Sequence, residues 1–258
     1  MNRRPHLLLI VLLLLIPLLT SCGNKIFRRA LPADAYHEAR ISQFPQVRFW
    51  ADAYDPGFEE RILAGMERAI GTYLEQGERP KERAMLLLSG GGADGAFGAG
   101  LLKGWTERGD RPIFTAVSGV STGALTAPFA FLGSDYDSLL ERMYTTMTES
   151  RVYEFKWLGD ILGSDSVSSP APLQRAIEEV VTLELLDAVA KEYAKGRFLF
   201  IQTTNLDAQR PVVWDMGLIA TIGGEKALAL FRQVMLASAS IPVMFPPQYI
   251  SVACPQFQ

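Results

Sequence analysis

The stretch FTAVSGVSTGALTA, residues 114–127, joins a short apolar run to a helix-like run through Gly119-Val120-Ser121-Thr122-Gly123. The continuous apolar residues predict a buried strand over 113–117, and the residues after the turn predict a helix over 121–132. G-x-S-x-G between a strand and a helix is typical of a nucleophile elbow, in which Gly119 and Gly123 remove side chains that would collide. Ser121 is therefore a candidate nucleophile; the alternative is a helix N-cap serine in a tight packing turn.

A second glycine-rich turn follows another apolar run. AMLLLS at 84–89 predicts a buried strand, and 96–108 predicts a helix closed by Gly109. The turn between them fits G-x-G-x-x-G, which alone would favour a nucleotide-binding oxidoreductase, but no acidic residue ends a second strand about 20 residues on. A Walker A loop is excluded because no Gly-Lys-Ser/Thr closes the turn. Beside an elbow, such a loop can direct backbone N–H groups at an oxyanion, so Gly90, Gly91 and Gly92 are the expected oxyanion hole.

Strands alternate with helices along the rest of the chain, which predicts an α/β domain with a mainly parallel central sheet flanked by helices. Further helices are expected over 58–76, 139–147, 172–195 (split near Thr182) and 225–238, and further strands over 198–204 and 212–214. Residues 24–54 lack clear periodicity and predict a tether that merges into irregular structure. In the 58–76 helix, Ile62, Met66 and Ile70 recur at helical spacing, for which core packing is favoured over membrane contact.

Composition narrows the possible functions. The net charge is −3 and no Lys/Arg run occurs, which argues against nucleic-acid binding. Two histidines and two cysteines are too few for a zinc site of the usual Cys/His kind, so neither a metal nor another cofactor is expected. Phe97, Phe129 and Phe131 lie near the two turns, where they are expected in the core rather than lining a pocket.

Four segments together resemble the patatin-like phospholipases: SGGGADGAFGAGLL (89–102), SGVSTGAL (118–125), TTNLDAQRPVVWDMG (203–217) and ASASIPVMFPP (237–247). The resemblance implies a three-layer α/β fold, an acyl-ester lipid such as a phospholipid as substrate, and hydrolysis by a Ser–Asp dyad. Many members carry Arg or Lys in the glycine loop where this chain has Asp94, which weakens an argument for anion-assisted substrate binding there.

The residue that would activate Ser121 is not evident. His6 lies in the leader and His37 in the irregular segment, so a Ser-His-Asp triad is not expected. The resemblance implies an aspartate in Asp-Gly-Gly or Asp-Gly-Ala after the tail motif, and neither motif occurs after Ser121. Asp207 and Asp215 stand near strand ends, where turn and cap roles are expected. The sequence therefore predicts either a truncated patatin-like hydrolase, incomplete at the C-terminus and impaired, or an inactive lipid- or partner-binding relative.

The N-terminus has the features of a leader. Arg3 and Arg4 precede an apolar run over 7–19, which is typical of a secretory signal peptide. Leu19-Thr20-Ser21-Cys22 resembles the lipobox of bacterial lipoproteins, which implies lipid on Cys22 and, by analogy, an outer-membrane protein facing the periplasm. The expected organisation is a signal peptide over 1–21, a tether and helical segment over 22–82, and the hydrolase domain over 83–258. Cys254 is then expected to be a free thiol.

Overall fold

The sheet at the centre of the chain has five strands in the order β1-β7-β6-β3-β2. In the computed structural model the described residues are 30–44, 46–75, 77, 83–146, 154–155 and 168–254, so the leader and Cys22 lie outside them. The strands are β1 (Arg48–Trp50), β2 (Ala84–Leu88), β3 (Phe114–Val120), β6 (Phe198–Asn205) and β7 (Arg210–Asp215). β2, β3 and β6 are mutually parallel, whereas β7 and β1 are added antiparallel. The predicted α/β class is confirmed, and the antiparallel strands make the sheet mixed.

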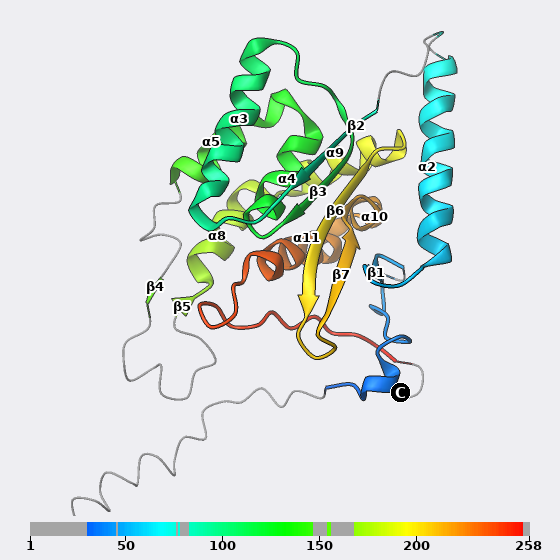
Figure 1. Cartoon of the computed structure of the whole chain (residues 1–258), viewed down its shortest axis with the longest axis vertical. Helices are drawn as coiled ribbons and strands as arrows, with labels where there is room; N and C mark the ends of the chain where they lie inside the picture. The colour runs from blue at the N-terminus through cyan, green and yellow to red at the C-terminus, as the bar shows by residue number, and fades with distance from the viewer. Residues whose placement is uncertain are drawn as a thin grey trace, which may run out of the picture.

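The helices that follow the strands cover one face of this sheet (Figure 1). α4 packs on β3 and α11 on β6. Phe129 and Phe131 of α4 and Phe231 and Met235 of α11 are fully buried and form the centre of the main core. The helices of this group are α3 (Gly95–Arg108), α4 (Thr122–Leu132), α5 (Asp137–Thr146), α8 (Ala171–Val180), α9 (Leu183–Ala194), α10 (Met216–Ile222) and α11 (Gly224–Ala239). Their burial against the sheet fixes the carboxyl ends of β2, β3 and β6 relative to one another.

Short elements complete the described part of the chain. Three 3-10 turns are present: η1 (Ala33–Ala35), η2 (Gly92–Asp94) and η3 (Ser134–Tyr136). A separate two-stranded ladder pairs β4 (Glu154–Phe155) with β5 (Ser168–Ser169). The predicted break between two helices falls at Thr182, whose hydroxyl accepts a hydrogen bond from the Leu185 amide and caps α9. Gly109, with a φ of 86°, ends α3 in the left-handed conformation, as expected for a helix-closing glycine.

Helix α2 (Pro56–Glu75) lies on the other side of the sheet from α3, α4 and α5 (Figure 1). It docks through small residues: Gly65 and Ala69 are buried, and a Cβ on Gly65 would lie 2.2 Å from the ring of Phe198. Met66 and Ile70 remain exposed, so the expected core packing of these two side chains is wrong. The reason is that the close approach at Gly65 brings the small residues against the sheet and leaves Met66 and Ile70 on the outer side of the helix, whereas Ile62 still packs against the cluster around Phe198.

The same face of the sheet is open at its β2 edge. Met85 and Leu87 alternate with the core-facing residues of β2, and their side chains are 68% and 75% exposed. Parallel sheets are ordinarily covered on both faces, so this edge departs from the usual layering. None of the helices in the described residues is long and apolar enough to cross a membrane.

Candidate functional site

The turn at Ser121 has the backbone geometry of a strained elbow. Ser121 adopts φ 56° and ψ −123°, a positive φ that non-glycine residues rarely show. The flanking glycines make the turn possible. A Cβ on Gly119 would lie 2.3 Å from the Gly123 carbonyl oxygen, and one on Gly123 would lie 2.3 Å from the Leu88 carbonyl oxygen. Both neighbours are backbone atoms, so only glycine fits at either position, and the turn places Ser121 at the carboxyl end of β3.

The Ser121 side chain does not cap α4. Although Ser121 occupies the N-cap position, its hydroxyl makes no capping hydrogen bond, so the N-cap interpretation of this serine is wrong. The residue is half-buried. Its side chain lies against the glycine loop: a Cβ on Gly90 would be 2.9 Å from the Ser121 Cβ and 3.5 Å from its Oγ. The hydroxyl thus remains available for chemistry, directly beside the backbone of the loop.

The expected oxyanion loop follows β2 and lies next to the elbow. Gly92 has a φ of 56°, and with Asp94 it forms the turn η2 before α3 begins. The amides of Gly90 and Gly91 donate to no other group among the described residues. At the end of the loop, a Cβ on Gly95 would lie 2.8 Å from the Thr122 Cβ. Loop and elbow are therefore in contact at both ends, and free N–H groups are available for an anion.

Ser238 is part of this site, and the sequence analysis did not include it among the candidate residues. Its Oγ accepts a hydrogen bond of 2.9 Å from the Ser121 amide and donates one of 2.6 Å to the Gln202 carbonyl. Ser238 lies in the last turn of α11, within the tail segment ASASIPVMFPP. The position of this segment among the family-like motifs was the signal that could have pointed to it. The hydroxyl connects α11 to the turn after β3 and to Gln202 within β6.

Asp215 lies away from the elbow and is already engaged. Its side chain is fully buried, Oδ1 accepts from the Leu218 amide to cap α10, and Oδ2 accepts from the Tyr193 hydroxyl at 3.3 Å. Burial raises the pKa of Asp215 to about 6, while the Leu218 amide and the Arg61 guanidinium, whose Nε is 3.7 Å from Oδ2, act in the opposite direction. The expected cap role is confirmed for Asp215.

The remaining candidate bases do not approach Ser121 either. Asp207 is exposed in the turn that joins β6 to β7, where its amide donates to the side chain of Asn205. His37 packs edge-on against Trp50 of β1, and three strand-to-strand steps separate β1 from β3. In the part of the chain that the structure describes, no hydrogen bond joins the Ser121 hydroxyl to a carboxylate or an imidazole. The site has a nucleophile-like serine and amide donors without a contacting base.

Other expected residues lie outside this site. Phe129 and Phe131 are core residues, as expected, whereas Phe97 is 77% exposed and its predicted burial is wrong, because it points outward from the first turn of α3. Cys254 is buried and unpaired. Among the described residues no three His, Cys, Asp or Glu side chains come together as metal ligands.

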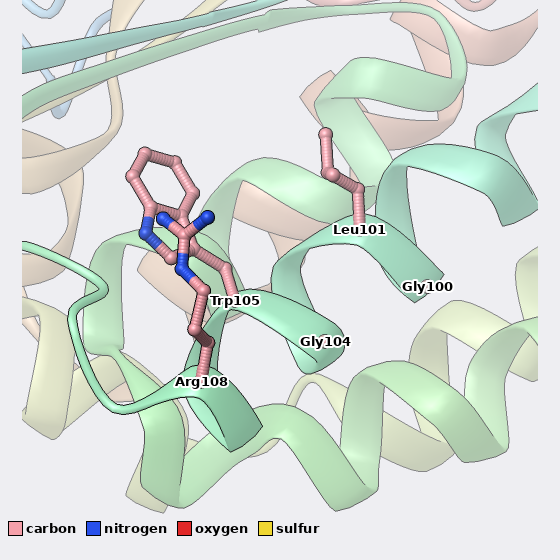
Figure 2. Close-up of a pocket in the computed structure, with 5 residues that line it drawn as sticks. All are labelled: Gly100, Leu101, Gly104, Trp105 and Arg108. Atoms are coloured by element: carbon pink, nitrogen blue, oxygen red, sulfur yellow. The ribbon is translucent and has the colours of Figure 1, made fainter.

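The outer face of α3 carries a hollow of about 500 Å³, well apart in the sequence from Ser121 (Figure 2). It is lined by Gly100, Leu101, Gly104, Trp105 and Arg108. Figure 2 shows the Trp105 and Arg108 side chains together on one side and Leu101 projecting separately from the same helix. The two glycines leave the space open because nothing lies within 4 Å of where their side chains would be. The lining has no nucleophile or carboxylate, so this hollow offers no catalytic chemistry.

The chain was compared with curated proteins and with protein-family models. No curated protein matches the chain. The family model described as Patatin-like phospholipase matches residues 86–253, which include both glycine turns, Ser238 and the tail segment. The match covers more than half of the chain and spans the strands and helices that build the elbow and the loop. The chain belongs to the patatin-like phospholipase family.

Proposed function

We propose that this chain carries an acyl-transfer site for ester lipids, with Ser121 as the nucleophile and the amides of Gly90, Gly91 and Gly92 as the oxyanion hole. One observation carries the proposal. The Ser121 hydroxyl makes no capping hydrogen bond, and it lies on a strained turn against the backbone of Gly90. Attack on a lipid ester carbonyl would place negative charge on its oxygen beside these amides. Membership of a phospholipase family supports a lipid ester as the substrate class.

The general base that would activate Ser121 is not identified. A Ser–Asp dyad is the expected arrangement, and no Asp-Gly-Gly or Asp-Gly-Ala follows Ser121 in these 258 residues. Asp215 is buried in its cap role, and Asp207 belongs to a turn. Loss of the partner of a serine nucleophile lowers turnover by about 10⁴-fold or more. We therefore propose that the hydrolysis catalysed by these 258 residues is slow relative to what a complete dyad would give.

A fluorophosphonate probe tests the assignment, because it phosphorylates an activated serine and reports the labelled residue by mass spectrometry. The full chain in detergent should be labelled at Ser121, and Ser121→Ala should lose the label. Ser118→Ala is the matched control, since Ser118 lies on the same strand and its hydroxyl accepts a hydrogen bond from the Gln202 side chain. Equal labelling of the Ser121→Ala variant and the parent chain would show that Ser121 is not the nucleophile.

A second candidate function is a non-catalytic protein that binds lipid or a partner at the same site. The observation that favours it is that, among the residues whose positions are described, no carboxylate or imidazole forms a hydrogen bond with the Ser121 hydroxyl. Incubation with phospholipid vesicles separates the two: binding accompanied by release of fatty acid supports the hydrolase, whereas saturable binding without any release supports the binding protein.

A further inference from the structure

We infer that Ser238 is a positioning residue for the nucleophile: its hydroxyl holds the Ser121 amide and thereby sets the direction in which the Ser121 side chain points. The inference rests on the proposed role of Ser121 and adds to it a residue 117 positions further along the chain.

The direction of both bonds at Ser238 follows from the chemistry of their partners. A backbone amide can only donate, and a backbone carbonyl can only accept. The single proton of the Ser238 hydroxyl must therefore point to the Gln202 carbonyl, 2.6 Å away, and a lone pair must face the Ser121 amide, 2.9 Å away. The hydroxyl has one orientation that satisfies both neighbours, so it forms a defined relay between β6 and the elbow.

This relay acts on the backbone torsion angle φ of Ser121. The direction of the Ser121 N–H fixes φ, and the direction of its carbonyl fixes ψ. The carbonyl is held by the Ala124 amide at 2.9 Å, within the first turn of α4. The amide is held by Ser238. With both peptide groups held, the Cα–Cβ bond of Ser121 has a single direction, even though its φ of 56° is strained.

Ser238 itself is firmly placed. It lies in the last turn of α11, whose preceding turns bury Phe231, Val234 and Met235 completely in the main core. On the other side, Gln202 pairs with Val120, the residue before Ser121, in the parallel β3–β6 ladder. Because both ends of the relay belong to packed elements, the elbow is supported by the core rather than by a mobile side chain.

The test compares Ser238→Ala with Ser238→Thr in the full chain in detergent, and uses Ser240→Ala as the control. Ser240 is the C-cap residue that follows α11, and its hydroxyl donates to the Leu236 carbonyl of that helix instead of to the elbow. Loss of the relay should reduce kcat and the fluorophosphonate labelling rate by about 10- to 100-fold with KM nearly unchanged. Threonine, which keeps the hydroxyl, should restore most of the rate, and Ser240→Ala should remain within about twofold of the parent.

Equal rates for Ser238→Ala and Ser240→Ala would overturn the inference, as would a loss confined to KM. If the parent chain neither turns over substrate nor reacts with the probe, the proposed function fails and amide hydrogen exchange still decides the role of Ser238. Exchange at the Ser121 amide should then accelerate at least about tenfold in Ser238→Ala and stay at the parent rate in Ser240→Ala. Unchanged exchange in both variants would show that Ser238 does not hold the elbow.

Discussion

Gly123 is the position at which the geometry of the elbow can be tested without any assumption about catalysis. A Cβ at this position would lie 2.3 Å from the Leu88 carbonyl oxygen, 2.7 Å from the Leu88 carbonyl carbon and 2.8 Å from the Ser89 carbonyl oxygen. These atoms are the backbone at the end of β2, which cannot rotate away as a side chain would. In Gly123→Ala the first turn of α4 and the end of β2 must therefore separate by roughly 1 Å to restore ordinary contact.

That displacement sets the expected size of the effect. Overpacking a well-packed core costs about 1–3 kcal/mol, and a contact with fixed backbone belongs at the upper end of this range. For a domain of this length, each kcal/mol lowers Tm by about 2–4 °C, so the Gly123→Ala substitution should lower Tm by about 4–12 °C. The loss should appear whether or not Ser121 performs chemistry.

Gly100→Ala is the control with the opposite sign. Gly100 lies in the interior of α3 with nothing within 4 Å of its missing side chain. Alanine there should stabilise the fold by about 0.5–1 kcal/mol, because glycine is the poorer helix former. Thermal unfolding followed by circular dichroism, in one detergent for all three proteins, measures both shifts. A Gly123→Ala protein that melts at or above the parent would refute the close approach of α4 to β2.

Two further predictions concern charged residues. Burial raises the pKa of Asp215 from its ordinary 3.8 to about 6. The folded state therefore binds the proton more tightly than the unfolded state, and the free energy of unfolding should fall by about 2 kcal/mol as the pH rises from 4 to 7. Urea unfolding of Asp215→Asn, which keeps a capping oxygen without a charge, should lack this component; parallel pH profiles for the two proteins would contradict it. Asp94 is exposed at the end of the glycine loop, where its charge opposes a developing oxyanion. Asp94→Asn should raise the fluorophosphonate labelling rate of Ser121 by roughly two- to fivefold, and by less at high salt. Asp135→Asn, beyond the far end of α4, should leave the rate unchanged. Equal rates in the parent chain and both variants would exclude an effect of the Asp94 charge.

The parts of the fold that could be predicted are those with a local signal. The apolar runs of β2 and β3, the helices after them and the break at Thr182 depend on neighbouring residues, and all of them were predicted to within a few positions. β1 was not predicted, because it has only three residues and owes its existence to pairing with β7, more than 160 residues away. α10 was also missed, since its seven residues are too few to establish a helical period.

The same distinction between local and distant signals applies to the site. Ser121 and Gly90 could be predicted as neighbours because both follow parallel strands that end at one edge of the sheet. Ser238 was not predicted as a neighbour of Ser121. The tail motif marked its segment, but the contact itself depends on how α11 packs against the sheet. Helix periodicity misled at Met66, because periodicity identifies an apolar stripe without saying whether a smaller stripe, here Gly65 and Ala69, makes the contact.

The contacts that hold the elbow are separate from those that would activate its serine. The strained φ of Ser121 costs of the order of 1–3 kcal/mol and persists only where the surroundings determine it. Those surroundings are the close approaches at Gly119 and Gly123 and the hydrogen bond from Ser121 to Ser238. None of these contacts involves an acid or a base, so placement of the nucleophile is independent of its activation. Serine hydrolases without a functional triad keep about 10³- to 10⁴-fold catalysis over water from oxyanion stabilisation and binding. The arrangement around Ser121 should therefore retain slow, measurable reactivity. The Ser238 and Asp94 variants should change that residual rate, although no carboxylate of the described residues forms a hydrogen bond with the Ser121 hydroxyl.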